Sequence, residues 1–251
     1  MRIHNVRAMR AAHASALLAA LLASVAQASP FVVSSTEPAE TVELKTSIEV
    51  KTRHDDDTWS APKMELAIPI APDVELSFSS SYRTLRLQGE AERAGLGDSG
   101  IASKWKLVHE APGRHPAIAI EPELVLPTGD ERDDLGDGHY GFVFPVIVGA
   151  TFGRVGLSGQ ATYQHSFSPD GDEVELAVLT TLKATPDVKL GVELAASAPA
   201  DDTSATDFSM DLGFKWGMTE AFELQGIAGT SLHTAEPGHI TRYRLVGEYH
   251  F

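Results

Sequence analysis

The adjacent residues His165 and Ser166 are the only arrangement in the chain that invites a nucleophilic mechanism. A serine hydroxyl becomes a nucleophile when a base lies within hydrogen-bond reach and a third group orients that base. Side chains that follow one another on a β-strand point to opposite faces, so this histidine is poorly placed to activate its neighbour. The sequence therefore predicts no catalytic residue and no enzymatic activity.

The acidic run from Gly129 to Gly138 could in principle hold a calcium ion. It does not match the twelve-residue calcium loop that ends in a bidentate glutamate, and Arg132 would repel the ion. The chain has no cysteine, which excludes a disulfide scaffold, a thiol nucleophile and a cysteine-bound zinc. We expect a solvated loop, no metal and no cofactor.

Charged residues also recur at every second position between apolar ones. Leu176 and Val178, for example, alternate with Glu173, Glu175 and Ala177. This period of two predicts β-strands with one apolar face and one polar face. No comparably long stretch has helical spacing, so the chain is predicted to be all-β.

Twelve segments share this pattern, and the connections between them differ in length. Most connections after even-numbered segments are short, whereas those after odd-numbered segments are longer and acidic. An even number of strands with tight turns at one end and loops at the other is typical of a transmembrane, antiparallel up-and-down β-barrel. A soluble sandwich alternates in the same way without sorting its loops by side, and it stays the alternative. The predicted strands are 41–53, 59–70, 74–87, 100–109, 116–127, 139–151, 154–166, 173–184, 187–198, 206–217, 221–232 and 240–251.

Two features oppose a regular barrel. Pro62, Pro69, Pro122 and Pro145 fall inside predicted strands, where each removes a hydrogen-bond donor from the ladder. Pro69 is near a strand end, where this is tolerated, but the central Pro122 and Pro145 call for bulges or for water on the lumen side. Residues 142–148 are apolar on both faces, as a buried sandwich strand would be.

The N-terminus has the features of a secretory signal peptide. Arg2, Arg7 and Arg10 precede an apolar stretch over residues 14–26, which ends at the small-x-small site Ala26-Gln27-Ala28. We predict a cleaved signal peptide over residues 1–28, a short periplasmic segment over 29–40 and the barrel over 41–251. For residues 29–40 two alternatives stay open, a plug inside the lumen and a free segment.

The charge balance narrows the class of partners. Among 251 residues, 35 Asp and Glu oppose 20 Lys and Arg, for a net charge of −15. Loss of the three arginines of the signal peptide makes this −18. Such acidity argues against nucleic acid as a partner. No apolar run reaches the roughly 18 to 20 residues of a membrane-spanning helix, which leaves strand-built membrane proteins open.

The last predicted strand ends in aromatic residues on its apolar face. Tyr249 and Phe251 lie on this face, and Phe251 is the C-terminal residue. An aromatic terminus of this kind resembles the signal that the outer-membrane assembly machinery reads in bacterial barrels. We therefore expect export through the periplasm into the outer membrane of a Gram-negative cell. The expected partners are that machinery, the lipid bilayer and a small-molecule solute.

The polar faces of a closed barrel line its interior. A turn near Pro112 would bring two lysines opposite two glutamates, and closure of the last strand on the first would bring two arginines near Glu49 and Lys51. Such ladders serve either to neutralise the interior or to bind a ligand. Twelve strands predict a narrow or partly plugged passage. The candidate lumen-lining residues are Lys104, Lys106, Glu121, Glu123, Glu175, Lys215, Arg242 and Arg244.

Two stretches carry a resemblance to a known family. Gly97-Asp98-Ser99-Gly100 opens a strand with basic and aromatic residues, and the strand from Glu121 ends in Leu126-Pro127-Thr128-Gly129-Asp130. The chain resembles the outer-membrane family named for the MetA pathway of phenol degradation. The resemblance implies a bacterial outer-membrane barrel, often labelled a transporter and linked in some members to genes for aromatic compounds. It implies no catalytic residues.

The predicted function is a passive channel or uptake protein for small molecules, with apolar and aromatic solutes among the candidates. The alternatives are a structural or surface-binding barrel whose acidic loops do the work and, less favoured, an outer-membrane hydrolase.

Overall fold

The computed structural model describes residues 29–53, 56–168, 171–235 and 238–251, so the predicted signal peptide lies outside the described residues. Apart from one 3-10 helix, η1 (Glu131–Asp133), the regular structure of the described residues consists of β-strands. The strands are β1 (Glu43–Arg53), β2 (Asp56–Ala71), β3 (Val74–Arg86), β4 (Arg93–Leu96), β5 (Ser99–Val108), β6 (Ala117–Ile120), β7 (Glu123–Leu126), β8 (Gly141–Phe152), β9 (Val155–Ser166), β10 (Glu173–Lys183), β11 (Val188–Pro199), β12 (Asp207–Gly217), β13 (Phe222–His233) and β14 (Ile240–His250).

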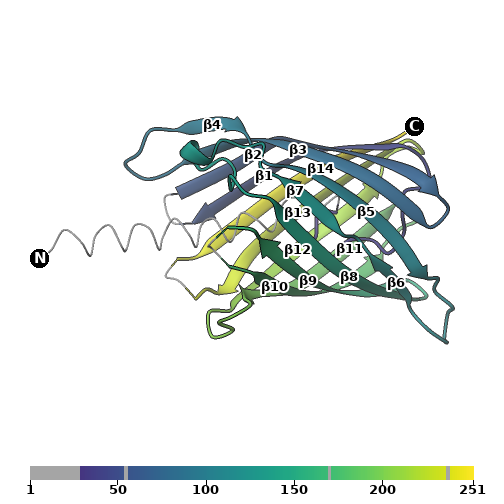
Figure 1. The fold of residues 1–251 in the computed structure, drawn as a ribbon. Helices are drawn as coiled ribbons and strands as arrows, with labels where there is room; N and C mark the ends of the chain where they lie inside the picture. Colours follow the sequence, from purple (N-terminus) through teal and green to yellow (C-terminus); the bar gives the residue numbers. More distant parts are fainter. Residues whose placement is uncertain (1–28, 54–55, 169–170, 236–237) are drawn as a thin grey trace, which may run out of the picture.

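These strands close into an antiparallel barrel (Figure 1). From β8 to β14, and from β1 to β3, each strand pairs with the next one in sequence, and the first strand β1 pairs with the last strand β14. Strand β3 also pairs with β5. Strands β6 and β7 together fill one position, since both pair with β5 and β8. Strands β4 and β5 fill another, since both pair with β3. The result is the predicted twelve-stranded barrel. No helix among the described residues is long and apolar enough to cross a membrane.

The four prolines coincide with irregularities in the strands. The register between β2 and β3 shifts around Pro62 and again after Pro69. Pro122 separates β6 from β7, and Pro145 of β8 lies opposite this break, where its carbonyl accepts the amide of Glu121 at 3.2 Å. The missing proline donors therefore fall where the ladder is already interrupted, as the sequence requires.

The two ends of the barrel differ. Short turns join β2 to β3, β8 to β9, β10 to β11 and β12 to β13, and β1 begins and β14 ends at this same end. In outer-membrane barrels the short turns face the periplasm and the longer loops face outward. The predicted loop over 88–99 contains β4, and β2 begins at Asp56, three residues before its predicted start.

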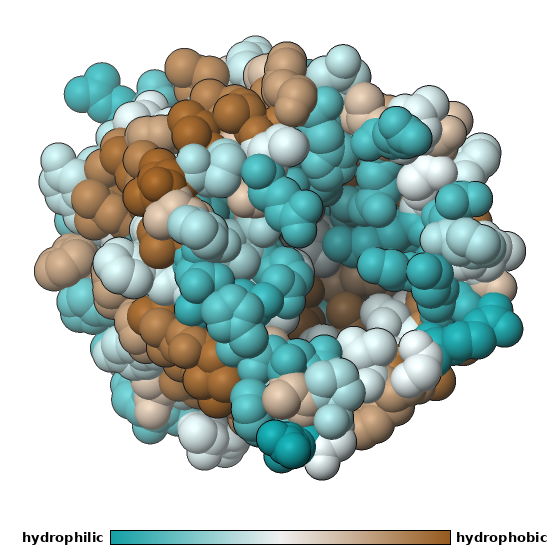
Figure 2. Space-filling view, turned by 90° about the vertical axis from the view of Figure 1, so that its right-hand side faces the viewer, coloured by the Kyte–Doolittle hydropathy of each residue, from teal (hydrophilic) through white to brown (hydrophobic). Residues whose placement is uncertain are grey.

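The two faces of each strand also differ. On β10 the outward Leu176 is 61% exposed, whereas the inward Glu175 is buried. The same contrast separates Leu212 from Asp211 on β12. Viewed from the short-turn end, the molecule is hollow, with hydrophilic residues around the opening and hydrophobic ones along the outer wall (Figure 2).

Candidate functional site

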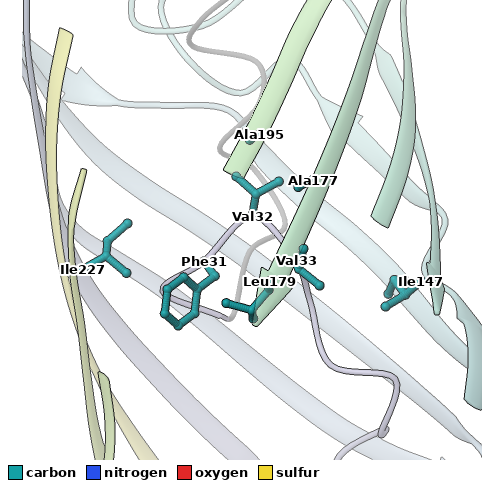
Figure 3. Close-up of a cluster of buried hydrophobic side chains, with 8 residues drawn as sticks. All are labelled: Phe31, Val32, Val33, Ile147, Ala177, Leu179, Ala195 and Ile227. Atoms are coloured by element: carbon teal, nitrogen blue, oxygen red, sulfur yellow. The ribbon is translucent and has the colours of Figure 1, made fainter. Parts of the chain in front are cut away.

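The described N-terminal segment lies inside the barrel. Phe31, Val32 and Val33 are 1–2% exposed. They pack against apolar side chains of the inner wall from four strands (Figure 3). We call residues 29–41 the plug. Of the two alternatives left open for residues 29–40, the structure has the plug inside the lumen and not a free periplasmic segment, because the apolar triplet packs against apolar residues of the inner wall. The wall residues are Ile147, Ala177, Leu179, Ala195 and Ile227.

Wall side chains satisfy the backbone of the plug. Both carboxylate oxygens of Glu193 accept amides, from Val32 at 2.8 Å and Val33 at 2.7 Å. Gln160 accepts the amide of Ser34 at 2.8 Å. An extended segment without a strand partner carries unsatisfied amides, and burial makes these costly unless something accepts from them. Here Glu193, which is 0% exposed, serves as the principal acceptor.

Two further carboxylates hold the following residues. Glu121 accepts the hydroxyl of Ser34 at 2.9 Å, and Glu75 accepts the amide of Ala39 at 2.7 Å. Lys106 pairs with Glu37 of the plug. The attachments therefore continue from the middle of the barrel toward the short-turn end.

A pair of glycines makes room for Phe31. Gly191 of β11 and Gly213 of β12 are register partners on the inner face. A Cβ on Gly191 would lie 2.5 Å from Phe31 Cζ, and one on Gly213 would lie 2.7 Å from it. Side chains at either position would occupy the space of the ring, so these glycines form its seat.

The candidate residues on β5, β6 and β7 lie close together. Lys104 Nζ is 3.4 Å from Glu121 Oε1, and both side chains are 4% exposed. Glu123 is buried next to the backbone of Gly100, and its carboxylate oxygens have no hydrogen-bond partner among the described residues. Of the predicted proximity between two lysines and two glutamates, the structure thus forms the Lys104–Glu121 pair, whereas Lys106 turns to the plug.

Strands β1 and β14 bring a second group together. Arg244 is the register partner of Glu49 and forms a buried ion pair with it, and Arg242 pairs with Asp211. Arg244 also donates to the carbonyl oxygen of Ser29 at 3.1 Å. The pair that closes the barrel therefore also contacts the start of the described plug.

Two cavities flank the plug. One of about 450 Å³ lies at the short-turn end, lined by the plug and by Lys104 and Lys215. Another of about 110 Å³ lies toward the loops and is lined by Glu175 and Arg242. Plug residues line the first cavity, whereas charged and apolar residues of the wall line the second.

The loop from 127 to 140 folds against the barrel end. Asp98 accepts the amides of Gly129 at 2.9 Å and Asp137 at 2.8 Å. Arg83 donates to the carbonyl of Leu135 at 3.0 Å, and Leu135 is buried. This explains the two quoted sequence stretches, because the Gly-Asp turn supplies the acceptor and Leu-Pro-Thr-Gly-Asp supplies one of the amides. These contacts hold the loop in place, while residues 130–133 stay exposed to solvent.

His165 and Ser166 face opposite sides of β9. His165 Nδ1 lies 2.6 Å from Asp172 Oδ1, and the ring stacks edge-on with Phe167. The buried Ser166 donates its hydroxyl to Ser168 at 2.8 Å. The two residues therefore do not serve each other.

The aromatic terminus lies at the short-turn end. The rings of Tyr249 and Phe251 meet edge-on with 5.0 Å between centroids, and Phe251 is highly exposed. The amide of Phe251 donates to the carbonyl of Val42 at 3.0 Å, so backbone hydrogen bonding continues one residue beyond the paired ends of β1 and β14.

Comparison with known proteins shows the family to which the chain belongs. The family model described as "Putative MetA-pathway of phenol degradation" matches residues 34–246. The chain belongs to this family. As an outer-membrane barrel of the family, it lies in the lipid bilayer with its apolar face outward. No curated protein matches the sequence.

Solved structures share the fold at low sequence identity. An outer membrane channel from Pseudomonas putida F1 is similar with a TM-score of 0.68 and 11% identity over 86% of this chain and 98% of that chain. The KdgM porin in complex with disordered oligogalacturonate has a TM-score of 0.54 and 12% identity over 82% and 99%. The NanC porin is similar with a TM-score of 0.57 and 7% identity, over 83% of this chain and 100% of that chain. The likeness is to channels and porins and concerns the fold.

Proposed function

We propose that this protein is a gated passive channel or uptake protein of the outer membrane for small solutes. The observation that carries the proposal is the plug, which crosses the lumen and is held there by wall side chains rather than by a strand partner. Glu193, Gln160 and Glu121 hold it through individual hydrogen bonds. A hydrogen bond to a charged acceptor contributes about 1.5 to 3 kcal/mol. None of these bonds joins one strand to another, so the segment can leave without unfolding the barrel.

The wall behind the plug bears on the class of solute. Displacement of the plug would uncover Ile147, Leu179 and Ile227 in an otherwise charged lumen. An apolar band inside a lumen that is otherwise lined by many charged residues suits small apolar or aromatic molecules, which would gain contact there without losing hydrogen bonds. We propose this solute class, and we propose that the eight charged lumen candidates line its path.

A surface role is the second candidate. The loop over 127–140 is fixed by Asp98, Arg83 and an ion pair between Arg93 and Asp134. A rigid acidic loop at the outer end could present a binding surface even if no solute passes. We propose no enzymatic role, because His165 and Ser166 lie on opposite faces.

Assembly and export complete the proposal. The exposed Tyr249 and Phe251 form the signal for the outer-membrane assembly machinery, and residues 1–28 direct export through the periplasm. Replacement of Phe251 by Ala would then lower the amount of folded barrel in outer-membrane fractions without altering synthesis.

The test compares the mature chain with a variant that lacks residues 29–38, both inserted in planar bilayers. The proposal predicts small single-channel conductance for the mature chain and a severalfold larger one for the deletion. Liposomes loaded with each protein should show faster entry of a phenol-sized aromatic solute after the deletion. A folded, heat-modifiable deletion barrel without conductance or solute entry would contradict a transport role.

A further inference from the structure

Three potential metal ligands meet where the barrel closes at its short-turn end. Glu43 begins β1, and its register partner His250 ends β14, with Glu248 two residues earlier on the same strand. One ligand atom from each residue lies within 4.8 Å of the others. His250 Nδ1 is 3.4 Å from Glu43 Oε1, and His250 Nε2 is 3.4 Å from Glu248 Oε1.

Neighbouring side chains fix both carboxylates from behind. Lys45 Nζ lies 2.9 Å from Glu43 Oε2, and Gln225 Nε2 donates to Glu248 Oε2 at 2.8 Å. In each carboxylate, therefore, Oε2 is engaged by another residue and Oε1 is turned toward His250. Outer partners that orient ligand atoms in this way are a regular feature of protein metal sites.

The surroundings favour a cation. The three residues line the cavity of about 450 Å³ at the short-turn end. Its lining holds seven glutamates against three lysines, and two of the lysines, Lys45 and Lys104, are already paired with carboxylates. A concave surface dominated by one sign of charge raises the local concentration of counter-ions.

We propose that Glu43, Glu248 and His250 bind a divalent transition-metal ion that bridges the first and last strands. One imidazole nitrogen with two carboxylate oxygens suits zinc and its first-row neighbours, whereas calcium and magnesium prefer oxygen ligands alone. Ligand atoms around one zinc ion lie roughly 3 to 3.5 Å apart, so small side-chain rotations bring these three into range.

One imidazole nitrogen holds the ion, and the other is left to donate a hydrogen bond, as metal-bound histidines commonly do. Water completes the coordination from the cavity. The proposal departs from the sequence-based expectation of no metal, because Glu43 and His250 are 207 positions apart in the chain and only the closure of the barrel joins them. Since the ligands come from both closing strands, bound metal should stabilise the closed barrel.

The test titrates Zn²⁺ into the mature chain, refolded in detergent micelles and carrying no histidine tag, by isothermal calorimetry. His250→Ala and Glu43→Gln are the test variants. His109→Ala is the matched control, because His109 also lies at the short-turn end but contacts a single carboxylate, Asp73, at 2.9 Å. Heat-modifiable gel mobility verifies that each variant is a closed barrel.

The expected result is one zinc site in the native chain, binding at least about tenfold weaker in His250→Ala and Glu43→Gln and unchanged in His109→Ala. Zinc should also raise the temperature at which the native barrel opens, but not that of His250→Ala. Equal zinc binding by His250→Ala and the native chain would overturn the proposal, and so would a loss of binding in His109→Ala as large as in His250→Ala. The readouts are binding and barrel opening, so they stand apart from any result on conductance.

Discussion

Single residues of the wall position the plug in two ways: glycines leave space for a side chain of the plug, and a glutamate accepts hydrogen bonds from its backbone. Phe31 lies against Gly191 and Gly213 because neither position carries a side chain. Glu193, two residues after Gly191 on β11, supplies two acceptors for consecutive amides. Space and hydrogen bonds thus select the same short stretch of the plug.

Substitution of Gly191 by Ala tests this seat. The new methyl group would meet Phe31 Cζ at 2.5 Å and Leu179 Cδ1 at 3.2 Å, which are ends of side chains rather than backbone. We expect the ring to be displaced and the single-channel conductance to rise, while the barrel stays folded. The double variant Phe31→Ala with Gly191→Ala serves as control. If Gly191→Ala conducts like the native chain, Phe31 does not set the barrier.

Asp172, in the loop before β10, gives a pH prediction. The hydroxyl of Tyr163 and then the ring of His165 hydrogen-bond its carboxylate and lower its pKa below the ordinary value. A carboxyl with a lowered folded-state pKa adds stability above its unfolded pKa of about 4 and loses it as the pH falls further. Tyr163→Phe should raise the pKa of Asp172, as measured by carbon NMR of the carboxyl group. An unchanged titration would show that the hydroxyl contributes nothing.

At the scale of elements, the pairing of β1 with β14 closes the barrel. The Arg244–Glu49 ion pair crosses it and is more than 90% buried on both sides. Removal of one partner from a buried pair typically costs about 3 to 5 kcal/mol, because the other charge stays behind. We expect Arg244→Ala to lower the free energy of unfolding by about 3 kcal/mol in urea titrations in micelles.

The matched control for Arg244→Ala is Arg86→Ala. Arg86 pairs with Glu92 at 2.7 Å, but both side chains are more than half exposed. An exposed pair is worth at most about 1 kcal/mol. A similar decrease in the free energy of unfolding in the two variants would mean that the Arg244–Glu49 pair is solvated and does not stabilise the closure of the barrel.

The loop over 127–140 is a second element whose position depends on one side chain, that of Asp98. Asp98→Asn keeps one acceptor oxygen, so one of the bonds to Gly129 and Asp137 is lost. We expect hydrogen exchange at these two amides to become faster by about tenfold, which corresponds to roughly 1 to 1.5 kcal/mol. Asp130→Asn is the control, since Asp130 caps only Arg132 within the loop. Unchanged exchange in Asp98→Asn would show that other contacts hold the loop.

The sequence predicted elements well where their pattern was local. Alternation along β10 and β12 located the strands, and the prolines correctly required irregularities. The placement of the plug could not be derived, because it depends on contacts such as Val33 with Glu193, which are 160 positions apart. A signal was present nonetheless. Ile147 and Leu179 interrupt the polar inner stripe, and such interruptions predict an apolar partner inside the lumen.

The candidate lumen residues show the same limit. The Lys104–Glu121 pair follows from strand neighbours joined by one connection, so its proximity could be predicted. The Lys106–Glu37 pair could not, because it needs the position of the plug. Strand periodicity gives the face of a side chain, while its partner across the lumen depends on the closed shape.

For the whole molecule, a barrel in a membrane requires that alternate residues of each strand face lipid and the lumen. The chain contains no cysteine, so single cysteines can be introduced along β10 and spin-labelled without background. Collisions of a spin label with oxygen show that the label lies in hydrocarbon, and collisions with a water-soluble nickel chelate show that it lies at an aqueous surface. Spin labels at positions 174 to 182, with the protein in liposomes, would test along the whole of β10 which side chains face lipid and which face the lumen.

The account predicts that oxygen accessibility oscillates with a period of two, with maxima at Val174, Leu176, Val178 and Leu182 and minima at Ala177 and Leu179, which face the plug. Uniformly low oxygen accessibility at both sets of positions would indicate a dry core between packed sheets. It would contradict a membrane-spanning barrel whose alternate residues face lipid.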